Sequence, residues 1–460
     1  MVGDTMEMRV TGDQDMPGAY LNNVQNVLNL LTLLFAGRVL MQLLQAISGD
    51  ALHLLPAFDQ WQSGAVSYAT LLGLQGATLI AMALGIFLVH RNCHFPGMGR
   101  FLRLAGVAYA GGMLVRFVIG YLQLSDVPWF NNPLPTAFHL VIAGYVLVLG
   151  GHWAEPKGRR IPALICRVAP HAAWPLTILL GLTLCHWMIR QGIPLTFATY
   201  LSVPLGTGAI CALEMLLPYK RVWTPDRKTV GQDALYMVLV QVALPALLTA
   251  FVLFAAETLA GTDWTILHQA WPHHWPIVAQ ILLMLILADF ARYWLHRAAH
   301  RLGPLWSLHA VHHAPSQLYF LNVGRFHPLD KALQLTLDAL PFTLIGVRPE
   351  VMAGYFVFYA LNGFFQHSNA DVRLGPLNHI IAGPELHRWH HAKDISRGAC
   401  NFGNNLILWD TLFGTRYLPE GKTVGALGIG NDAWPTDFTR QTLAPFRISP
   451  DHMNTKEADK

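Results

Sequence analysis

The clearest chemical signal in the sequence is a set of histidines in four short stretches between residues 296 and 391. In the segments HRAAH and HAVHH, rings three or four residues apart share one face of a helix. Imidazole binds iron, copper, zinc and nickel ions, so ligand type alone does not select iron. A zinc ion takes four ligands, so nine rings are too many for one ion and suit two. The nine candidate ligands are His296, His300, His309, His312, His313, His367, His387, His390 and His391.

Three nearby residues could assist this set. His327 and His379 could each add a ligand, orient another ring or cap a helix. Asp289 lies seven residues, or two helical turns, before His296. Ligating histidines usually donate their second N–H to a carboxylate or a carbonyl, so Asp289 could accept this bond from His296. The alternative for Asp289 is an ion pair with Arg292 at i+3.

The helices that carry these histidines are those of a membrane protein. Of the 460 residues, 53% are hydrophobic and 13% are charged, against roughly 25% charged in an ordinary soluble domain. Apolar stretches of about 20 residues can cross the hydrocarbon core as helices. Two shorter segments, about 332–346 and 350–366, are expected to form a re-entrant or tightly turned hairpin. The eight predicted spans are roughly 24–46, 66–89, 104–124, 134–152, 172–189, 195–217, 234–256 and 276–295.

The loops between these spans alternate in charge. Because positive short loops stay in the cytoplasm, both termini and the histidine-bearing end of the last span are predicted to be cytoplasmic. The net charge of +4 then reflects membrane sidedness and anionic lipid, not nucleic-acid binding. The expected fold is all-α, a polytopic transmembrane helix bundle with a cytosolic helical cap that carries the metal site. Loops 90–103, 153–171 and 218–232 are basic, whereas loops 47–65, 125–133 and 257–275 have no Lys or Arg.

The basic segment WAEPKGRR marks a boundary near residues 155–170. We predict an N-terminal four-helix transmembrane module over 1–155, a catalytic domain over 156–420 and a cytosolic tail over 421–460. Residues 1–20 are polar and acidic, so a cleavable signal peptide is not expected.

Two arginines, Arg38 and Arg116, lie inside predicted spans of the N-terminal module. An unpaired charge is costly there. Each could bind a lipid headgroup, but we favour pairing within the protein or snorkelling toward the membrane surface.

Together with their neighbours, the histidine motifs resemble those of the fatty acid hydroxylase and sterol desaturase superfamily of integral-membrane di-iron enzymes. The resemblance covers about residues 205–418 and includes one HxxxH and two HxxHH motifs. The string DFARYWLHR precedes these motifs at 289–297, and NFG followed by WDTLFGT closes them at 401–415. The QHSN and GPLN segments are most similar to those of bacterial members and of the alkylglycerol monooxygenase branch.

The resemblance implies O2-dependent hydroxylation of a C–H bond in a lipid or sterol-like substrate. It implies two iron ions (Fe2+/Fe3+) as cofactors, O2 as co-substrate, and the nine histidines as ligands. No cysteine spacing suits an iron–sulfur cluster. The two electrons are therefore expected from a separate protein of the ferredoxin, rubredoxin or cytochrome b5 type. The expected location is a bacterial inner membrane.

Two alternatives stay open from the sequence. A desaturase would use the same two metal ions and diverge only after the first hydrogen abstraction. A metal-binding transporter would need polar residues in several spans. Spans 66–89 and 134–152 contain no Asp, Glu, Lys or Arg, which disfavours transport.

Overall fold

The computed structural model of the protein describes residues 17–48, 55, 57–61, 67–91, 93, 95–122, 132–154, 163–248, 270–393, 399–429 and 434–447. Contacts between Cα atoms divide the chain into two compact units. The N-terminal unit comprises Met1–Ser48 and Phe58–Pro162, and the C-terminal unit comprises Gly49–Ala57 and Ala163–Lys460. The roles predicted for 1–155, 156–420 and 421–460 stay predictions.

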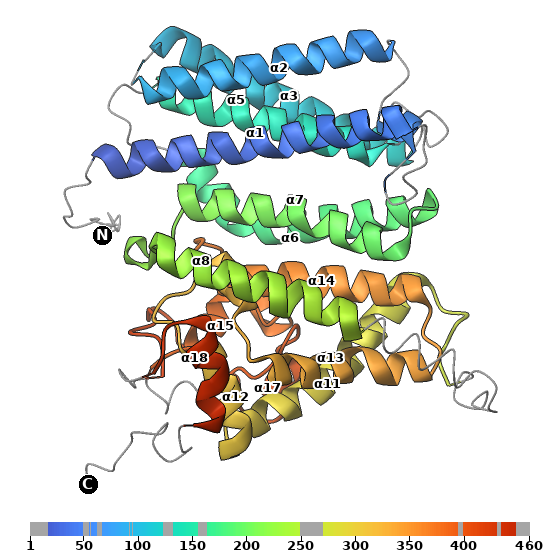
Figure 1. Cartoon of the computed structure of the whole chain (residues 1–460), viewed down its shortest axis with the longest axis vertical. Helices are drawn as coiled ribbons and strands as arrows, with labels where there is room; N and C mark the ends of the chain where they lie inside the picture. Colours follow the sequence, from blue (N-terminus) through green and yellow to red (C-terminus); the bar gives the residue numbers. More distant parts are fainter. Residues whose placement is uncertain are drawn as a thin grey trace, which may run out of the picture. The chain divides into compact units, whose positions relative to one another are not determined.

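The described part of the chain is almost entirely helical, with three isolated β-bridges and no strand (Figure 1). Eight of its helical segments are long and apolar enough to cross a membrane, which confirms the predicted all-α, multi-pass architecture. These segments are Asn23–Ser48, Tyr68–His90, Pro96–Ile119, Pro133–Ala154, Arg167–Arg190, Phe197–Leu216, Arg227–Leu248 and Ile277–Ala299. Which side of the membrane each loop faces stays a prediction.

Four helices begin seven to nine residues earlier than the sequence suggested, at Pro17, Pro96, Ala163 and Arg227. The third span starts at Pro96, so Arg100 and Arg103 are helical, although we expected them in a loop. Proline suits the first turn of a helix because its missing N–H would have no partner there. The seventh span starts at Arg227, where the Asp226 side chain caps the helix by accepting from the Thr229 N–H. The end of this predicted span, 249–256, lies outside the described residues.

The N-terminal unit holds both of its intramembrane arginines inside the protein. Arg38 donates to the carbonyl oxygen of Trp61 at 2.6 Å and to Gln42 Oε1 at 3.0 Å. Arg116 donates to the Thr136 hydroxyl. Each side chain is thus hydrogen-bonded as expected for pairing within the protein. The helices of this unit are α1 (Pro17–Ser48), α2 (Tyr68–His90), α3 (Pro96–Leu122) and α5 (Pro133–Ala154).

In the C-terminal unit, three helices meet around one leucine side chain. Leu361, on α14, is fully buried. A Cβ atom added at Gly206 on α7 would lie 2.5 Å from Leu361 Cδ2, and one at Gly181 on α6 would also collide with this side chain. The two glycines therefore form the recess that lets α14 pack closely on both neighbours. The bounds are Ala163–Arg190 for α6, Leu195–Leu216 for α7 and Pro349–His367 for α14.

The two shorter apolar segments form helices joined by a tight turn, as expected. They are α13 (Pro328–Leu344) and α14, and Gly346 between them has φ +76°, a left-handed conformation that glycine adopts without strain. α11 (Ile277–Ala299) packs against both helices. This packing fixes the end of α11, where the first histidines lie.

We expect Gly206→Ala to lower the free energy of unfolding by about 1–3 kcal/mol, because the new methyl group displaces Leu361. Alanine has a higher helix propensity than glycine, which by itself would raise the free energy of unfolding. A decrease would therefore come from the collision with Leu361. The measurement is the thermal midpoint of the purified protein in detergent.

Gly231→Ala on α8 (Arg227–Tyr236) is the matched control, because a Cβ there meets no atom within 4 Å. It should not lower the midpoint. The smaller side chain in the double variant Gly206→Ala, Leu361→Val should recover part of the loss. An unchanged midpoint in Gly206→Ala would contradict the packing described for α14.

Candidate metal centre

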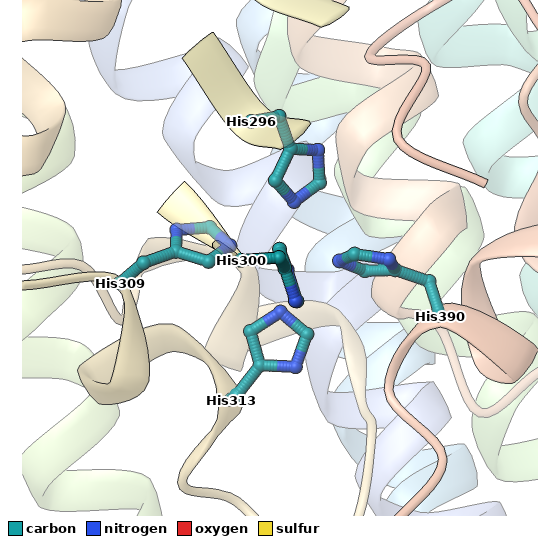
Figure 2. A group of neighbouring side chains, drawn as sticks. All are labelled: His296, His300, His309, His313 and His390. Carbon is teal, nitrogen blue, oxygen red and sulfur yellow. The ribbon is translucent and has the colours of Figure 1, made fainter. Parts of the chain in front are cut away.

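The nine candidate histidines converge in the C-terminal unit as two neighbouring groups. Within each group, one ring nitrogen per residue lies within 4.8 Å of all the others. The rings of the two groups are adjacent, since the ring centroids of His313 and His391 are 4.3 Å apart. Figure 2 shows the five rings of the first group directed toward one centre. The first group is His296, His300, His309, His313 and His390, and the second is His312, His367, His387 and His391.

Each HxxHH motif supplies ligand positions to both groups. In α12 (Gly303–His313), the i,i+4 pair His309 and His313 joins the first group, and His312 turns toward the second. The helix α15 (Pro384–His390) and its capping residue make the opposite division. The i,i+4 pair His387 and His391 joins the second group, and His390 joins the first.

The remaining rings come from the ends of two long helices. His296 lies in the last turn of α11, and His300 is the residue that caps this helix. His367 is the last residue of α14. Because both helices end at the centre, their rings are held by elements that pack into the core of the C-terminal unit.

In the first group, the ring nitrogens facing the centre lack protein partners. The Nε2 atoms of all five rings are buried, and none has a hydrogen-bond partner among the described residues. The opposite nitrogens of three rings are anchored. Nδ1 of His296 donates to Phe402 O at 2.8 Å, that of His390 to Cys400 O at 2.8 Å, and that of His309 to Asp330 Oδ2 at 2.9 Å. This pattern leaves the lone pairs of Nε2 aimed inward, as a metal ion requires.

The two carbonyl anchors depend on the conformation of one residue. Asn401 has φ +55°, and it is the single non-glycine residue with positive φ in the described part of the chain. Asparagine tolerates this left-handed region better than most residues. Its side chain fixes the turn by donating to Leu386 O at 2.9 Å and accepting from the Tyr417 N–H at 2.7 Å. The carbonyls on either side, of Cys400 and Phe402, can therefore both reach histidines.

In the second group, the Nε2 atoms face one another directly. They are 3.3 Å apart between His312 and His367, 3.1 Å between His367 and His387, and 3.0 Å between His387 and His391. Nδ1 of His312 and of His367 lie against the oxygens of Arg325 and Asn322, so these Nδ1 atoms carry the protons. The inward lone pairs of His312 and His367 repel unless a cation lies between them. Metal–nitrogen bonds of about 2.0–2.1 Å would place tetrahedral ligands roughly 3.3–3.4 Å apart, close to this spacing.

Burial favours the neutral form of most of these rings. It lowers the pKa of His390 to about 3, and neighbouring imidazoles act in the same direction for most of the other rings. Neutral imidazole is the form that binds metal ions, so little competition from protons is expected near pH 7. Burial, as the largest cause, also lowers the pKa well below the ordinary value for His300, His312, His313, His387 and His391.

One carboxylate touches the centre directly. Burial alone would raise the pKa of Asp330, but His309 and Gln334 together hold this pKa below its ordinary value. The Gln334 side chain donates to Asp330 Oδ1 at 2.9 Å, which leaves Oδ2 for His309. Asp330 is thus a negative charge beside the first group, and it fixes the tautomer of His309.

Comparison with known proteins places this centre in a family. Residues 281–415 match the fatty acid hydroxylase family profile, and the range contains all nine histidines. Ornithine lipid hydroxylase OlsE from Rhizobium tropici is 35% identical over 278 residues, covering 59% of this chain and 82% of that protein. The chain belongs to the fatty acid hydroxylase family.

Other members of the fatty acid hydroxylase family match shorter stretches. Alkylglycerol monooxygenase from Danio rerio is 31% identical over 181 residues, 39% of this chain and 39% of the relative. The human alkylglycerol monooxygenase is 28% identical over 217 residues, 46% of this chain and 47% of the relative. Hydroxylases and monooxygenases are oxidoreductases, and the chain is an enzyme of this class. No solved structure matches the chain.

The three residues expected to assist the histidines, Asp289, His327 and His379, make other contacts or lie elsewhere. His296 contacts Phe402 O and not Asp289, whose carboxylate accepts from the backbone N–H groups of Asn405 and Leu406. The proposed contact of Asp289 with His296 is therefore not formed. The alternative ion pair is not formed either, since Arg292 pairs with Asp338 at 2.6 Å. The two helical turns between Asp289 and His296 place the carboxylate too far along α11 to reach the ring.

The two further histidines lie outside both groups. His327 caps α13, where its ring accepts from the Leu329 N–H at 3.1 Å and contacts Thr442 O at 3.0 Å. His379 is exposed in the 3-10 helix Gly375–His379. Sequence proximity to a histidine motif therefore did not bring either ring to the centre.

Buried carboxylates were the main feature that sequence reasoning missed. Besides Asp330, Asp233 accepts from the Arg325 side chain at 2.6 Å, and the Arg325 carbonyl anchors His312. Glu214 accepts from the backbone N–H groups of Phe320 and Asn369, each at 2.6 Å. The only sequence signal for Glu214 was a lone acid in an apolar span, which is costly and so usually has a role.

We expect Asp330→Asn to weaken metal binding about 10- to 100-fold, as is typical when the partner of a ligating histidine is changed. The amide keeps the shape of the carboxylate but removes its negative charge from His309. The measurement is metal retained per chain during titration with a chelator. Asp371→Asn, at a half-exposed ion pair with Arg373, is the control and should bind metal as the parent does.

Asp289→Asn should loosen the segment that carries Phe402. The asparagine oxygen could still accept from the backbone N–H groups of Asn405 and Leu406, but the Asn405 side-chain amide would lose its acceptor, at a cost of about 1–3 kcal/mol. Hydrogen exchange of residues 402–407 should become faster, with the amides of α14 unaffected. Equal exchange in Asp289→Asn and the parent protein would show that this carboxylate does not hold the segment.

Proposed function

We propose that this protein is a membrane-bound, non-haem di-iron monooxygenase that hydroxylates a C–H bond of a lipid. The observation that carries the proposal is the convergence of nine histidines in groups of five and four, with inward Nε2 lone pairs that lack other partners or face one another. The proposal uses O2 as co-substrate and two electrons from a separate ferredoxin, rubredoxin or cytochrome b5 type of protein.

The donor set fits two iron ions. Nine imidazoles in two groups exceed what four-coordinate zinc sites need, and imidazole is a suitable ligand for iron. The carboxylate of Asp330 adds negative charge next to the first group, which favours a more highly charged ion there. Bound iron would supply the activation of O2 that attack on an unactivated C–H bond requires.

The protein's own residues would hold that chemistry in place. The outward Nδ1 anchors of His296, His309 and His390 fix the direction of each ring, so little reorganisation is needed when metal binds. The rings of the second group are all buried, which keeps bulk water from their inward nitrogens.

A lipid substrate is supported by the names of the relatives and by the eight apolar helices. The relative matched over most of its length acts, by its name, on ornithine lipids, so an amino-acid-containing membrane lipid is the first substrate to test. We further propose that the protein lies in a bacterial inner membrane, with the metal centre and both termini on the cytoplasmic side.

The test is anaerobic purification with ferrous iron, followed by addition of O2, a reductant and membrane lipids. We expect about two iron ions per chain and a product one oxygen atom heavier than the substrate. His312→Ala should lose metal and activity yet still insert, because insertion depends on the apolar spans and not on the ligands.

His379→Ala is the matched control, since this ring is exposed and outside both groups; it should keep the metal and the activity. A preparation without iron that consumes no O2 would refute the proposal. A product two hydrogens lighter would identify the desaturase alternative. Iron transport into vesicles without oxidation of lipid would identify the transporter.

A further inference from the structure

The outward surface of α11 carries a ridge of exposed apolar side chains. Trp294, at its end, is 42% exposed, and the guanidinium of Arg297 lies 5.4 Å from the centre of its ring. Tryptophan and arginine are typical of the level where hydrocarbon meets headgroups. The ridge comprises Val278, Leu282, Ile286, Phe290 and Trp294, each four residues from the next.

This ridge spans most of the hydrocarbon thickness. The 16 residue-to-residue steps from Val278 to Trp294 rise about 24 Å along the helix, and a bilayer core is about 30 Å thick. The edge of the hydrocarbon is therefore expected between Trp294 and Arg297, and residues of α11 before Trp294 lie below that edge.

A short helix after the last histidine motif lies beside the ridge. The helix α17 (Leu408–Leu412) contacts α11. Trp409 Nε1 donates to Ile286 O at 3.2 Å, and the Trp409 ring lies 4.7 Å from that of Phe290. The ring of Phe413 lies 5.0 Å from that of Trp294. These contacts hold residues 408–413 at the depth of the second half of the ridge.

The exposed side chains of this segment are apolar apart from Thr411, whose hydroxyl donates to Ile407 O at 3.1 Å. Leu408 is 43% exposed, Leu412 is 67% exposed and Phe413 is 36% exposed. They extend the α11 ridge sideways into one continuous apolar patch. A patch of this kind marks a surface that another phase or molecule covers.

The backbone that leads into α17 is arranged as lipid surroundings require. Residues 402–407 are not helical, and irregular backbone at membrane depth must find its hydrogen-bond partners within the protein. Asp289 accepts from the N–H groups of Asn405 and Leu406. Asp410 accepts from those of Phe402 and Gly403, at 2.7 and 2.6 Å. Two buried carboxylates thus replace the water that would serve these amides outside the membrane.

We propose that residues 402–413 form a re-entrant membrane segment, whose Leu408, Leu412 and Phe413 side chains contact the acyl chains of one leaflet. The occupant of the patch is lipid, because the patch is continuous with the lipid-facing ridge of a membrane-spanning helix and ends at Arg297. The segment joins the turn at Asn401 to the membrane, so it sets the depth of the metal centre. The inference does not depend on the proposed reaction.

The test places a fluorescent NBD label on Leu412→Cys in phosphatidylcholine and phosphatidylglycerol vesicles, with Cys93 changed to Ser. We expect emission shifted to the blue, strong quenching by lipids with a nitroxide on the acyl chain, and protection from iodide in the water. The Cys93→Ser parent without the new cysteine measures labelling of the other cysteines.

Glu420→Cys is the matched control, because this exposed residue lies beyond the segment; its label should be quenched by iodide and not by the nitroxide lipids. A thermal midpoint equal to that of the Cys93→Ser parent shows that each labelled protein is folded, and Leu408→Cys provides a second position if Leu412→Cys does not fold. Iodide quenching at both segment positions would overturn the proposal. So would protection from iodide without nitroxide quenching, since that result would mean that protein covers the patch.

Discussion

The repulsion between inward-facing imidazole lone pairs is the constraint on which the C-terminal unit depends. Burial lowers the pKa of most of these rings, so protonation does not relieve the repulsion. Without a cation, close approach of the rings is unfavourable, and the fold must hold them against it. It does so with outward anchors: backbone carbonyls for His296 and His390, and a carboxylate for His309. The packing of α11, α13 and α14 fixes the helix ends that carry these rings.

Helix periodicity explains why the histidine set could be predicted from the sequence. In an HxxHH motif all three rings lie broadly on one side of the helix, but the ring at i+3 is about 100° around the axis from the ring at i+4 and can reach a second centre. Two such helices that face each other can therefore contribute to two adjacent centres, as α12 and α15 do. The membrane spans could also be predicted, because a helix needs about 20 apolar residues to cross a bilayer and such stretches are easily recognised in a sequence. The helix starts at Pro96 and Arg227 were missed because the first turns of these helices are less apolar than the spans that follow. Proline begins the first of these helices, and the Asp226 side chain caps the second.

The surroundings of the histidines could not be predicted in the same way. Asp289 accepts from the backbone N–H of Asn405, which lies 116 residues further along the chain. No local sequence pattern indicates a contact over that separation. Asp330 was overlooked because it starts an apolar helix 21 residues from His309. Such contacts arise from tertiary packing, so one sequence shows the ligands of a centre more readily than the groups that orient them.

The left-handed turn at Asn401 links helices that are far apart in the chain. Its two flanking carbonyls hold one ring from α11 and one from α15, so the distance between these helices is set by a single peptide geometry. Metal binding and the order of this turn are thus thermodynamically linked, and each stabilises the other. Because the turn is buried, with Asn401 2% exposed, an ion held by these two rings would also stabilise the contact between the two helices against local unfolding.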